Sequence, residues 1–361
     1  MENEGIALST VLAELHARRG AELGVWFGCR LPDSFGNWKD EYRFLRESLA
    51  LIDKNYRAYL RFTGPDRVRY LNAILTNDIK GLHENHANVS LFLSPQGHIQ
   101  AEIETHALAG ELLCVSYAMI RERLVPALDK YIIMDDVTLE DATAEWASLA
   151  LEGPKAAQAI AELAGVDLHA LEDLESRAVS VSGIPCRLVK RTPGKAASGE
   201  LLAQAKDAAA LWDVLLEAAK RRGGGAAGYR ALNSMRLEQG IPWFGYDFGE
   251  KQIPHEAGLQ DSHISYTKGC YTGQEIVERV RSRGQVNRVR VSLGFAADAI
   301  PRATSPLLSA GKEVGQVTRV GFSVANDEGI GMGYVRREHS TVGTTLQTND
   351  GSAKVIATPL A

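Results

Sequence analysis

The chain has 361 residues, of which 45% are apolar and 24% are charged, an ordinary composition for a globular protein. Single hydrophobic cores usually stop growing near about 250–300 residues, so we expect two or three domains. The net charge of -5 and the pI of about 6.0 give the molecule no overall attraction to nucleic acid or to anionic lipid. Any contact with either must therefore be local.

The N-terminus, MENEGIALSTVLAELHARRG, lacks the basic start and the long apolar run of a signal peptide. No stretch of the sequence reaches the ~18–20 apolar residues that a membrane span needs. We therefore predict a cytoplasmic protein. The cysteines lie more than seventy residues apart, which argues against a self-contained metal site, and we predict no metal ligands. They are Cys29, Cys114, Cys186 and Cys270.

The first predicted elements follow each other as helix, strand and helix. Residues 37–53 carry apolar side chains at three- and four-residue steps, which predicts an amphipathic helix. Alternation over residues 56–63 predicts a strand, with Tyr59 on the face opposite Leu60. Gly64-Pro65-Asp66 ends this strand before another helix. The same order returns in LALEGPKAAQAIAEL, with a strand at about 148–151, and indicates two related α+β halves.

The segment between these two copies, residues 88–118, is predicted to be sheet. Pro95-Gln96-Gly97 marks a hairpin turn, and Ile99, Ala101, Ile103 and Thr105 share one face of the following strand. A helix containing Trp212 closes the second half, and the glycines at 223–225 predict a linker. Beyond Gln285, short β runs with frequent glycine predict a small barrel or sandwich.

The most informative segment is KGCYTGQE, residues 268–275. Thr272 and Glu275 have the spacing of a capping box, which predicts a helix that starts at Gly273. Cys270 would then precede a helix N-terminus, where the helix dipole and Lys268 both favour the thiolate. The alternative is that Cys270 is a small buried hydrophobic residue, and composition alone favours that alternative.

A second informative segment is GYRALNSMRLEQGIPWFGYDF, in which Arg236 and Glu238 end a short predicted helix before Gly240. A carboxylate can accept two parallel hydrogen bonds from the ring N–H and the amino group of a pterin, and Glu238 suits that role. Local sequence alone favours an ion pair between Arg236 and Glu238, or plain solvation. Asp247 can support the turn that follows.

Two further polar clusters have both an ordinary and a functional interpretation. Asn77 and Asp78 in LTND end a predicted helix, where capping or an Asx turn is their usual role. An arginine run after Glu278 can hold a folate's glutamyl tail or a phosphate backbone. Equally, it can be a helix C-terminus followed by an exposed strand face. The run consists of Arg279, Arg281, Arg283, Arg288 and Arg290.

KGCYTGQE resembles the diagnostic motif of the YgfZ folate-binding proteins, relatives of the glycine-cleavage T-protein (an aminomethyltransferase) that act in iron–sulphur cluster assembly. LRFTGPDRVRYLNAILTNDI resembles a first-domain segment shared with T-protein, and NSMRLEQGIPWFGYDF resembles the segment that contacts pterin. GQVTRVGFS and GIGMGYV resemble the C-terminal barrel. The resemblance covers about residues 35–340, is weaker over 165–225 and is absent from the first thirty residues.

The resemblance implies an α+β chain, a T-protein-like three-domain ring with ferredoxin-like α+β domains and a small C-terminal β-barrel. Folate would lie in or near the central opening. We assign residues 1–145 to a first α+β folate-binding domain, completed by 226–285. Residues 146–225 form a second, ferredoxin-like α+β domain, and residues 286–361 form the barrel.

The resemblance also implies roles for single residues, with tetrahydrofolate or a derivative as the cofactor. Glu238 matches the carboxylate that holds the pterin, Asn77 and Asp78 match the loop that borders it, and Cys270 matches the motif thiol, the candidate catalytic residue. The remaining predicted folate contacts are Tyr271, Gln274 and Arg279.

One departure from T-protein bears on function. T-protein carries an aspartate pair just after the glycine of the hairpin turn, where this chain has Gln100 and Ala101, with Glu102 one position further along. We therefore predict a tetrahydrofolate-binding accessory protein for the assembly or repair of iron–sulphur proteins rather than an ordinary enzyme, with Cys270 acting on a partner or a transferred cluster.

Two alternatives stay open. The first is a folate-dependent aminomethyl or one-carbon transferase. The second is a factor in tRNA or RNA modification that contacts RNA weakly through Arg279–Arg290. The expected partners of the leading interpretation are iron–sulphur client or assembly proteins, and we expect a monomer without membrane contact.

Overall fold

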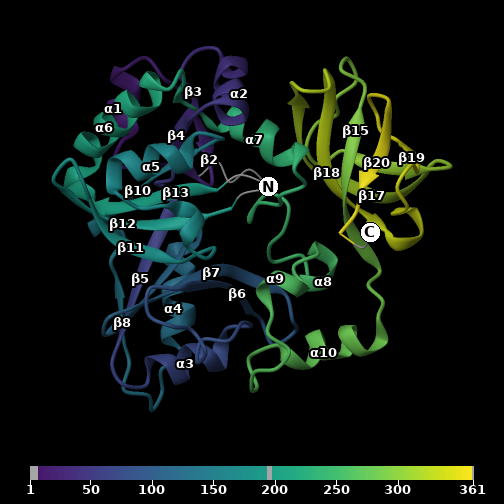
Figure 1. Cartoon of the computed structure of the whole chain (residues 1–361). Helices are drawn as coiled ribbons and strands as arrows, with labels where there is room; N and C mark the ends of the chain where they lie inside the picture. Colours follow the sequence, from purple (N-terminus) through teal and green to yellow (C-terminus); the bar gives the residue numbers. More distant parts are fainter. Residues whose placement is uncertain (1–6, 193–196, 360–361) are drawn as a thin grey trace. The chain divides into compact units, whose positions relative to one another are not determined.

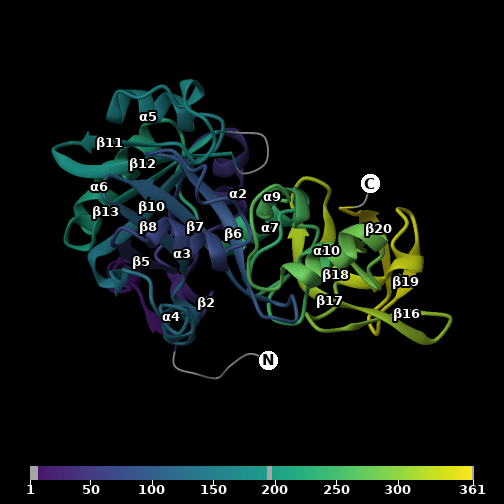
Figure 2. The same cartoon turned by 90° about the horizontal axis from the view of Figure 1, so that it is seen from below.

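The computed structural model describes residues 7–192 and 197–359. They form two compact units, which are coloured along the chain in Figure 1 and shown from below in Figure 2. The first unit contains the described residues up to Tyr70, together with Gly81–Asn88 and Glu104–Leu232. The second contains Leu71–Lys80, Val89–Ile103 and the described residues from Asn233 onward. The division into three domains that we inferred from the sequence stays a prediction.

A six-stranded sheet in the order β11-β12-β13-β10-β4-β14 forms one layer of the first unit. Its strands are β4 (Ala50–Asp53), β10 (Trp146–Glu152), β11 (Ser176–Val181), β12 (Ile184–Arg191), β13 (Ser198–Gln204) and β14 (Gly225–Ala226). Helices α5 (Ala156–Ala164) and α6 (Ala208–Arg221) pack on this sheet, because Ile160 and Trp212 share one core cluster with Leu149. The predicted helix around Trp212 is confirmed as α6.

A five-stranded sheet in the order β6-β7-β8-β5-β9 contains the predicted strand and hairpin. Its strands are β5 (Arg57–Thr63), β6 (Ala87–Leu93), β7 (Ile99–Leu108), β8 (Glu111–Tyr117) and β9 (Thr138–Asp141). Tyr59, on the face opposite Leu60, is also buried, where it packs with Val115 against Val189 and Leu202 of the six-stranded sheet. The two sheets therefore pack face to face within the first unit.

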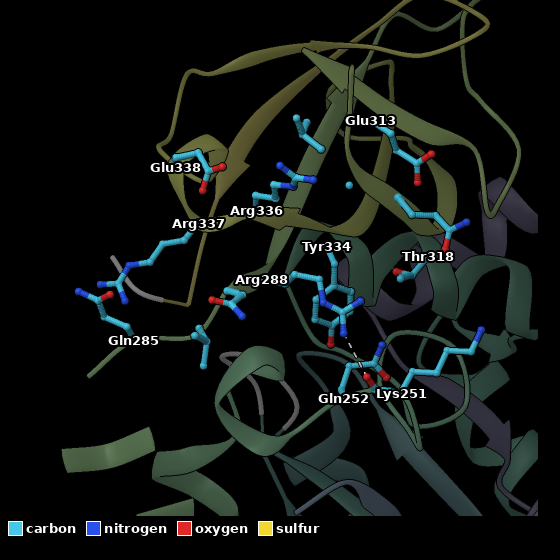
Figure 3. A pocket seen from close by; sticks show the side chains of 15 residues that line it. Lys251, Gln252, Gln285, Arg288, Glu313, Thr318, Tyr334, Arg336, Arg337 and Glu338 are labelled. Carbon is cyan, nitrogen blue, oxygen red and sulfur yellow. Dashed lines mark hydrogen bonds between the residues drawn. The ribbon is translucent and has the colours of Figure 1, made fainter. Parts of the chain in front are cut away.

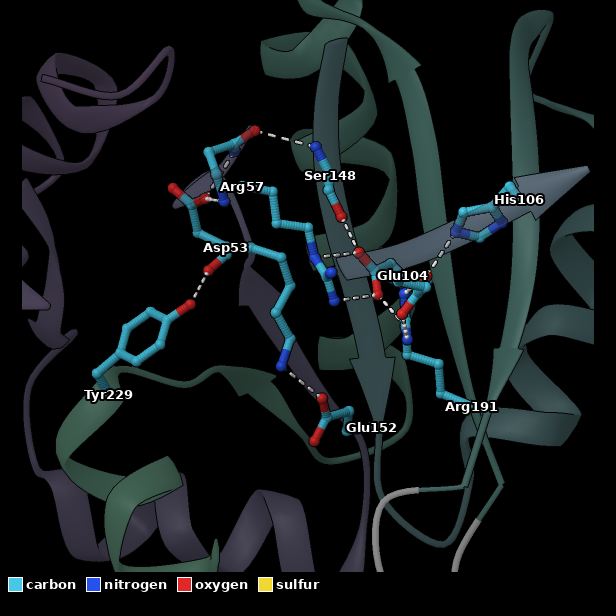
Figure 4. Close-up of polar contacts among 11 residues, drawn as sticks. Asp53, Arg57, Glu104, His106, Ser148, Glu152, Arg191 and Tyr229 are labelled. Carbon is cyan, nitrogen blue, oxygen red and sulfur yellow. Dashed lines mark hydrogen bonds and ion pairs between the residues drawn. The ribbon is translucent and has the colours of Figure 1, made fainter. Parts of the chain in front are cut away.

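The space between these two sheets also holds a buried set of charges, which we call the inter-sheet charge network (Figure 4). Its members are Arg57, Glu104, His106, Arg191 and Glu200. Two nitrogens of Arg191 each donate to Glu104 at 2.7 Å, and Arg191 also pairs with Glu200. Arg57 Nε lies 2.9 Å from Glu200 Oε1. Each buried carboxylate thus has a cationic partner, which buried charges require.

Both Gly-Pro turns of the predicted repeat are present, since β5 leads to α3 (Arg67–Ile74) and β10 leads to α5. Gly64 has φ +94° and Gly153 has φ +117°, a region that side-chain-bearing residues rarely adopt. A Cβ on Gly64 would lie 2.2 Å from the carbonyl oxygen of Asp136, and one on Gly153 would lie 2.7 Å from that of Ser48. Each turn therefore requires glycine for two reasons, conformation and space.

The helix predicted over residues 37–53 is wrong in its second half. Helix α2 (Trp38–Glu47) ends at Ser48, and the apolar residues that follow form β4. All four residues of β4 are buried, and the strand pairs with β10 and β14. A short, continuously apolar run does not distinguish a buried strand from a helix by its periodicity, and sheet pairing decided the outcome here.

The glycine linker predicted at residues 223–225 is also wrong. Gly225 belongs to β14, which pairs in parallel with β4. A Cβ on Gly224 would lie 1.9 Å from the carbonyl oxygen of Leu49. Glycine is needed here because two backbone segments approach closely, and not because the chain is a flexible connector.

Smaller elements complete the first unit. A three-stranded sheet has the order β1-β3-β2, formed by β1 (Leu8–Ser9), β2 (Glu22–Trp26) and β3 (Cys29–Ser34). The helical elements are α1 (Ala13–Arg18), η1 (Ala118–Ile120), α4 (Arg121–Asp129), η2 (Thr143–Glu145), η3 (Leu168–Ala170) and η4 (Ala205–Asp207).

The second unit contains a closed barrel in the order β15-β18-β17-β16-β19-β20, which confirms the predicted C-terminal barrel. Its strands are β15 (Arg288–Phe295), β16 (Pro306–Ser309), β17 (Lys312–Ser323), β18 (Glu328–Arg336), β19 (Thr345–Gln347) and β20 (Ser352–Ala357). The helical elements near it in sequence are α7 (Tyr229–Glu238), α8 (Pro254–Ala257), α9 (Gln260–His263), α10 (Gln274–Arg283) and η5 (Arg337–His339). Val291, Leu293 and Val335 contribute to the core of the barrel. None of the described helices is long and apolar enough to cross a membrane.

Candidate functional site

Glu238 is the last residue of α7, as the sequence predicted, and its carboxylate is oriented by the barrel. The hydroxyl of Ser323, at the end of β17, donates to Glu238 Oε1 at 2.6 Å. The side chain is half-buried. A carboxylate has about four acceptor positions, so the hydrogen bond from Ser323 leaves capacity for further donors.

Arg236 pairs with Asp247 and not with Glu238, so the ion pair considered in the sequence is wrong. Arg236 is 4% exposed, donates to Asp247 and to the carbonyl oxygen of Ile241, and lies over the ring of Trp243. The same carboxylate accepts from Trp243 N at 2.9 Å, which confirms that Asp247 supports the turn. Burial drives this choice, because a buried guanidinium needs a fixed partner.

Two aromatic rings lie beside this end of α7. Trp243 and Tyr246 are half-buried with ring centroids 6.1 Å apart. Arg236 lies 4.6 Å from the centroid of Trp243, and Arg319 lies 4.6 Å from that of Tyr246. Partly exposed rings of this kind are suited to stacking on a planar heterocycle.

Asn77 and Asp78 make local hydrogen bonds in the loop after α3. Asn77 Nδ2 donates to the carbonyl oxygen of Val89 at 3.0 Å, and its Oδ1 accepts from Asp78 N at 2.9 Å. Asp78 Oδ1 in turn accepts from Lys80 N at 3.0 Å. The bond between Lys80 N and Asp78 is of the Asx type that local sequence favoured. Together these contacts fix the loop, whose folate-contacting role stays a prediction.

Lys268 fastens the same loop to the KGCYTGQE motif. Its ammonium donates to the carbonyl oxygens of Asn72, Leu75 and Asn77 at 2.7, 2.5 and 2.8 Å. Burial lowers the pKa of Lys268 from 10.5 to about 8. The sequence predicted that this ammonium would favour the thiolate of Cys270, whereas it is instead directed at the end of α3.

The predicted capping box at the start of α10 is wrong. The N-cap is Gly273, not Thr272, and no side chain caps the helix. Gly273 has φ +80°, and a Cβ there would lie 2.6 Å from the carbonyl oxygen of Ser94 in the β6–β7 hairpin. Packing of α10 on the hairpin, where Ile276 meets Gly97, replaces the local cap as the reason why the helix starts here.

Cys270 is exposed, whereas the other three cysteines are buried. Its neighbour Tyr271 is 7% exposed, and the hydroxyl of Tyr271 has no hydrogen-bond partner within the described part of the chain. The Lys268 ammonium lies 5.2 Å from the centroid of the Tyr271 ring. Gln274 is half-buried and Arg279 is exposed, both on α10. The alternative that Cys270 is a core residue is therefore wrong.

We expect iodoacetamide to modify Cys270 first and the other cysteines about a hundredfold more slowly. Burial raises the pKa of Cys29 and Cys114 to about 12 and that of Cys186 to about 11, so they present little thiolate. Mass spectrometry of peptides after brief labelling measures the order. Modification of any buried cysteine before Cys270 would contradict this prediction.

The hairpin strand β7 presents Glu102 to a histidine that sequence reasoning missed. His263 Nε2 lies 3.0 Å from Glu102 Oε1, and His263 Nδ1 lies 2.7 Å from the hydroxyl of Ser262. Thr76 Oγ1 donates to the carbonyl oxygen of His263 at 2.6 Å. Ala101 is fully buried and Gln100 is half-buried. Glu102 and His263 are 161 residues apart in the chain, and no local pattern links them.

The arginine run does not form one basic face. Arg290 is 6% exposed and donates to the carbonyl oxygens of Ala257 and Gly240. Arg281 pairs with Glu278, and Arg288 pairs with Glu256. The predicted exposed strand face is therefore wrong at Arg290, where α8 packs over the strand.

Comparison with models of protein families identifies the family of the chain. The model of the GCVT N-terminal domain matches residues 12–263, and that of the glycine cleavage T-protein C-terminal barrel domain matches residues 288–360. The chain belongs to the glycine cleavage T-protein family. A relative named aminomethyltransferase, from Symbiobacterium thermophilum, is 29% identical over 97% of this chain and 96% of the relative. Another relative of that name, from a Geobacillus species, is 28% identical over 97% of both chains.

The T-protein fold predicted from the sequence is confirmed. The glycine cleavage system aminomethyltransferase T from Bartonella henselae has a crystal structure that matches with a TM-score of 0.87. That match covers 98% of each chain at 23% sequence identity. The mixed α/β sheets and the closed six-stranded barrel are therefore those of this family.

Proposed function

We propose that this T-protein family member binds tetrahydrofolate or a derivative and serves in the maturation of iron–sulphur proteins, as its resemblance to the YgfZ branch implies. The observation that carries the proposal is the exposed thiol of Cys270 inside KGCYTGQE, a motif whose Gly273 packs against the hairpin that carries no aspartate pair. Cysteine sulphur is a soft ligand that suits iron–sulphur chemistry, and exposure leaves it accessible to a partner.

The residues at the end of α7 fit a pterin. Glu238 is a half-buried carboxylate oriented by Ser323, which suits acceptance of paired N–H groups. Trp243 and Tyr246 offer rings for stacking. In this proposal Asn77 and Asp78 border the ligand, and Tyr271, Gln274 and Arg279 are further contacts.

A second candidate function is aminomethyl transfer to tetrahydrofolate, which the names of the relatives favour. One contact in this chain also supports it. Glu102 is a carboxylate on the hairpin strand one position beyond Ala101, and its pairing with His263 supplies a group that can accept a proton. The two candidates share folate binding and differ in turnover.

Calorimetric titration with tetrahydrofolate and its formyl and methylene forms tests the shared part. We expect Glu238→Gln to weaken binding by about 1–3 kcal/mol, roughly tenfold to a hundredfold, because it turns one acceptor into a donor that faces pterin N–H groups. Glu217→Gln, at an exposed ion pair with Lys220, is the matched control. Unchanged affinity in a folded Glu238→Gln protein would remove this residue from the site.

Two further measurements separate the candidates. Lipoyl-bound aminomethyl substrate supplied with tetrahydrofolate should give no transfer above background, and steady turnover near ~1 per second or more would favour the transferase. In cells that lack the protein, Cys270→Ser should fail to restore the activity of iron–sulphur enzymes while folate binding persists. Full restoration by that variant would contradict the maturation role of the thiol.

A further inference from the structure

A polar pocket of about 960 Å³ lies on the outer side of the barrel in the second unit (Figure 3). It is formed by strands β15, β17 and β18 together with η5 and the segments at 251–252 and 285–287. Four cations line it, Lys251, Arg288, Arg336 and Arg337, against the two acids Glu313 and Glu338. The pocket therefore carries an excess of positive charge.

Two of these cations stand at paired positions on neighbouring strands. Arg288 of β15 is directly opposite Arg336 of β18 in the antiparallel register. Like charges in such a pair destabilise a sheet. Glu256 pairs with Arg288 at 3.3 Å, but no residue in the described ranges forms an ion pair with Arg336. An external anion would relieve this repulsion.

A buried hydroxyl in the same pocket is also without a partner. Tyr334 lies two positions before Arg336 on the same face of β18, opposite Arg290. It is 5% exposed, and no hydrogen-bond partner for its hydroxyl occurs among the described residues. Burial raises the pKa of Tyr334, so the hydroxyl stays protonated and available as a donor. An unpaired buried hydroxyl costs free energy that a ligand's acceptor oxygen would recover.

The geometry points to a ligand site that is additional to the folate site. We propose that this pocket binds a small molecule with two or more anionic oxygen groups, held by Arg336 and Arg288 and accepting a hydrogen bond from Tyr334. Such oxygen groups occur as phosphates or as carboxylates. Guanidinium groups recognise both by paired, charge-assisted hydrogen bonds.

Titration calorimetry of the full chain tests the proposal with two probes, tripolyphosphate and tri-γ-glutamate. We expect at least one probe to bind, and to bind more weakly at high salt. Arg336→Gln should weaken that binding about tenfold, and Tyr334→Phe, which removes only the hydroxyl, by about threefold to tenfold. Arg302→Gln, an exposed arginine outside the pocket, is the control that should leave binding unchanged.

The relative affinity of the two probes identifies the source of the ligand. Tighter binding of tripolyphosphate indicates a phosphorylated metabolite, and tighter binding of tri-γ-glutamate indicates a polycarboxylate. Absence of binding by both probes would overturn the proposal. So would binding that Arg336→Gln and Tyr334→Phe leave unchanged, because the anion would then lie elsewhere.

Discussion

Replacing Arg191 by methionine should lower the free energy of unfolding by about 3–5 kcal/mol, because two buried carboxylates would lose the cation that they share. Arg191 donates twice to Glu104 and pairs with Glu200, whose side chains are 8% and 1% exposed. Methionine is uncharged and fills a similar volume, so the loss of unfolding free energy reports on the charge more than on packing. Urea denaturation at neutral pH measures the difference.

A surface ion pair provides the control for this substitution. Arg18 pairs with Glu14 on α1, with both side chains more than three-quarters exposed. Arg18→Met should cost about 0.5 kcal/mol or less, as exposed pairs usually do. Equal losses for the Arg18 and Arg191 variants would contradict a special role for the inter-sheet charge network.

The deficit of the Arg191 variant should also depend on pH. Burial opposes the charged form of Glu104, but Arg191 and His106 hold its pKa well below the ordinary value of 4.5. Without Arg191, burial would raise that pKa above the unfolded value. The folded variant would then bind more protons than the unfolded chain, so its deficit should shrink as the pH falls from 7 toward 5. A deficit independent of pH would indicate lost packing instead.

Lys268→Met should destabilise the second unit by about 2–3 kcal/mol and loosen the loop at Asn77. Three carbonyl oxygens would lose their common donor, and methionine offers none in exchange. Hydrogen exchange at residues 75–80 should therefore become faster in the variant. Lys312→Met, at an exposed lysine of β17, is the control and should change neither quantity.

The loss of stability caused by Lys268→Met should grow as the pH rises above 8. The pKa of Lys268 is about 8 in the folded chain and has the ordinary value of 10.5 in the unfolded chain. Between these values the unfolded chain binds more protons, so the wild-type protein gains stability as pH rises from 8 to 10.5. Lys268→Met lacks this gain, and the difference between the two proteins should widen across that range. A constant difference would show that Lys268 does not titrate there.

Local patterns predicted those parts of the fold that depend on local interactions. Gly64 and Gly153 marked their turns because only glycine combines positive φ with the close approach of another backbone segment. The helix prediction failed over residues 48–53 because the strands that pair with β4 lie far away in sequence. These strands are β10 and β14. Gly224 looked like a linker for the same reason, since Leu49, which it contacts, is distant in the chain.

In the candidate site, too, local features were predictable from the sequence and long-range contacts were not. Glu238 was recognisable at its helix end, but its hydrogen bond to Ser323 required the barrel. The sequence predicted that Lys268 favours the thiolate of Cys270, whereas its ammonium donates hydrogen bonds to carbonyl oxygens at the end of α3. Glu102 was visible as an acid, and its partner His263 was not, because pairing across 161 residues leaves no local signal.

The distribution of the cysteines has a practical consequence for studying the protein. With three thiols enclosed and Cys270 at the surface, a maleimide fluorophore or spin label can be attached to the unmodified chain at one chosen position. The label would sit two residues from Lys268, whose ammonium ties the motif to the loop at Asn77. Its mobility would therefore report directly on whether a ligand or partner stiffens that junction, without any engineered cysteine.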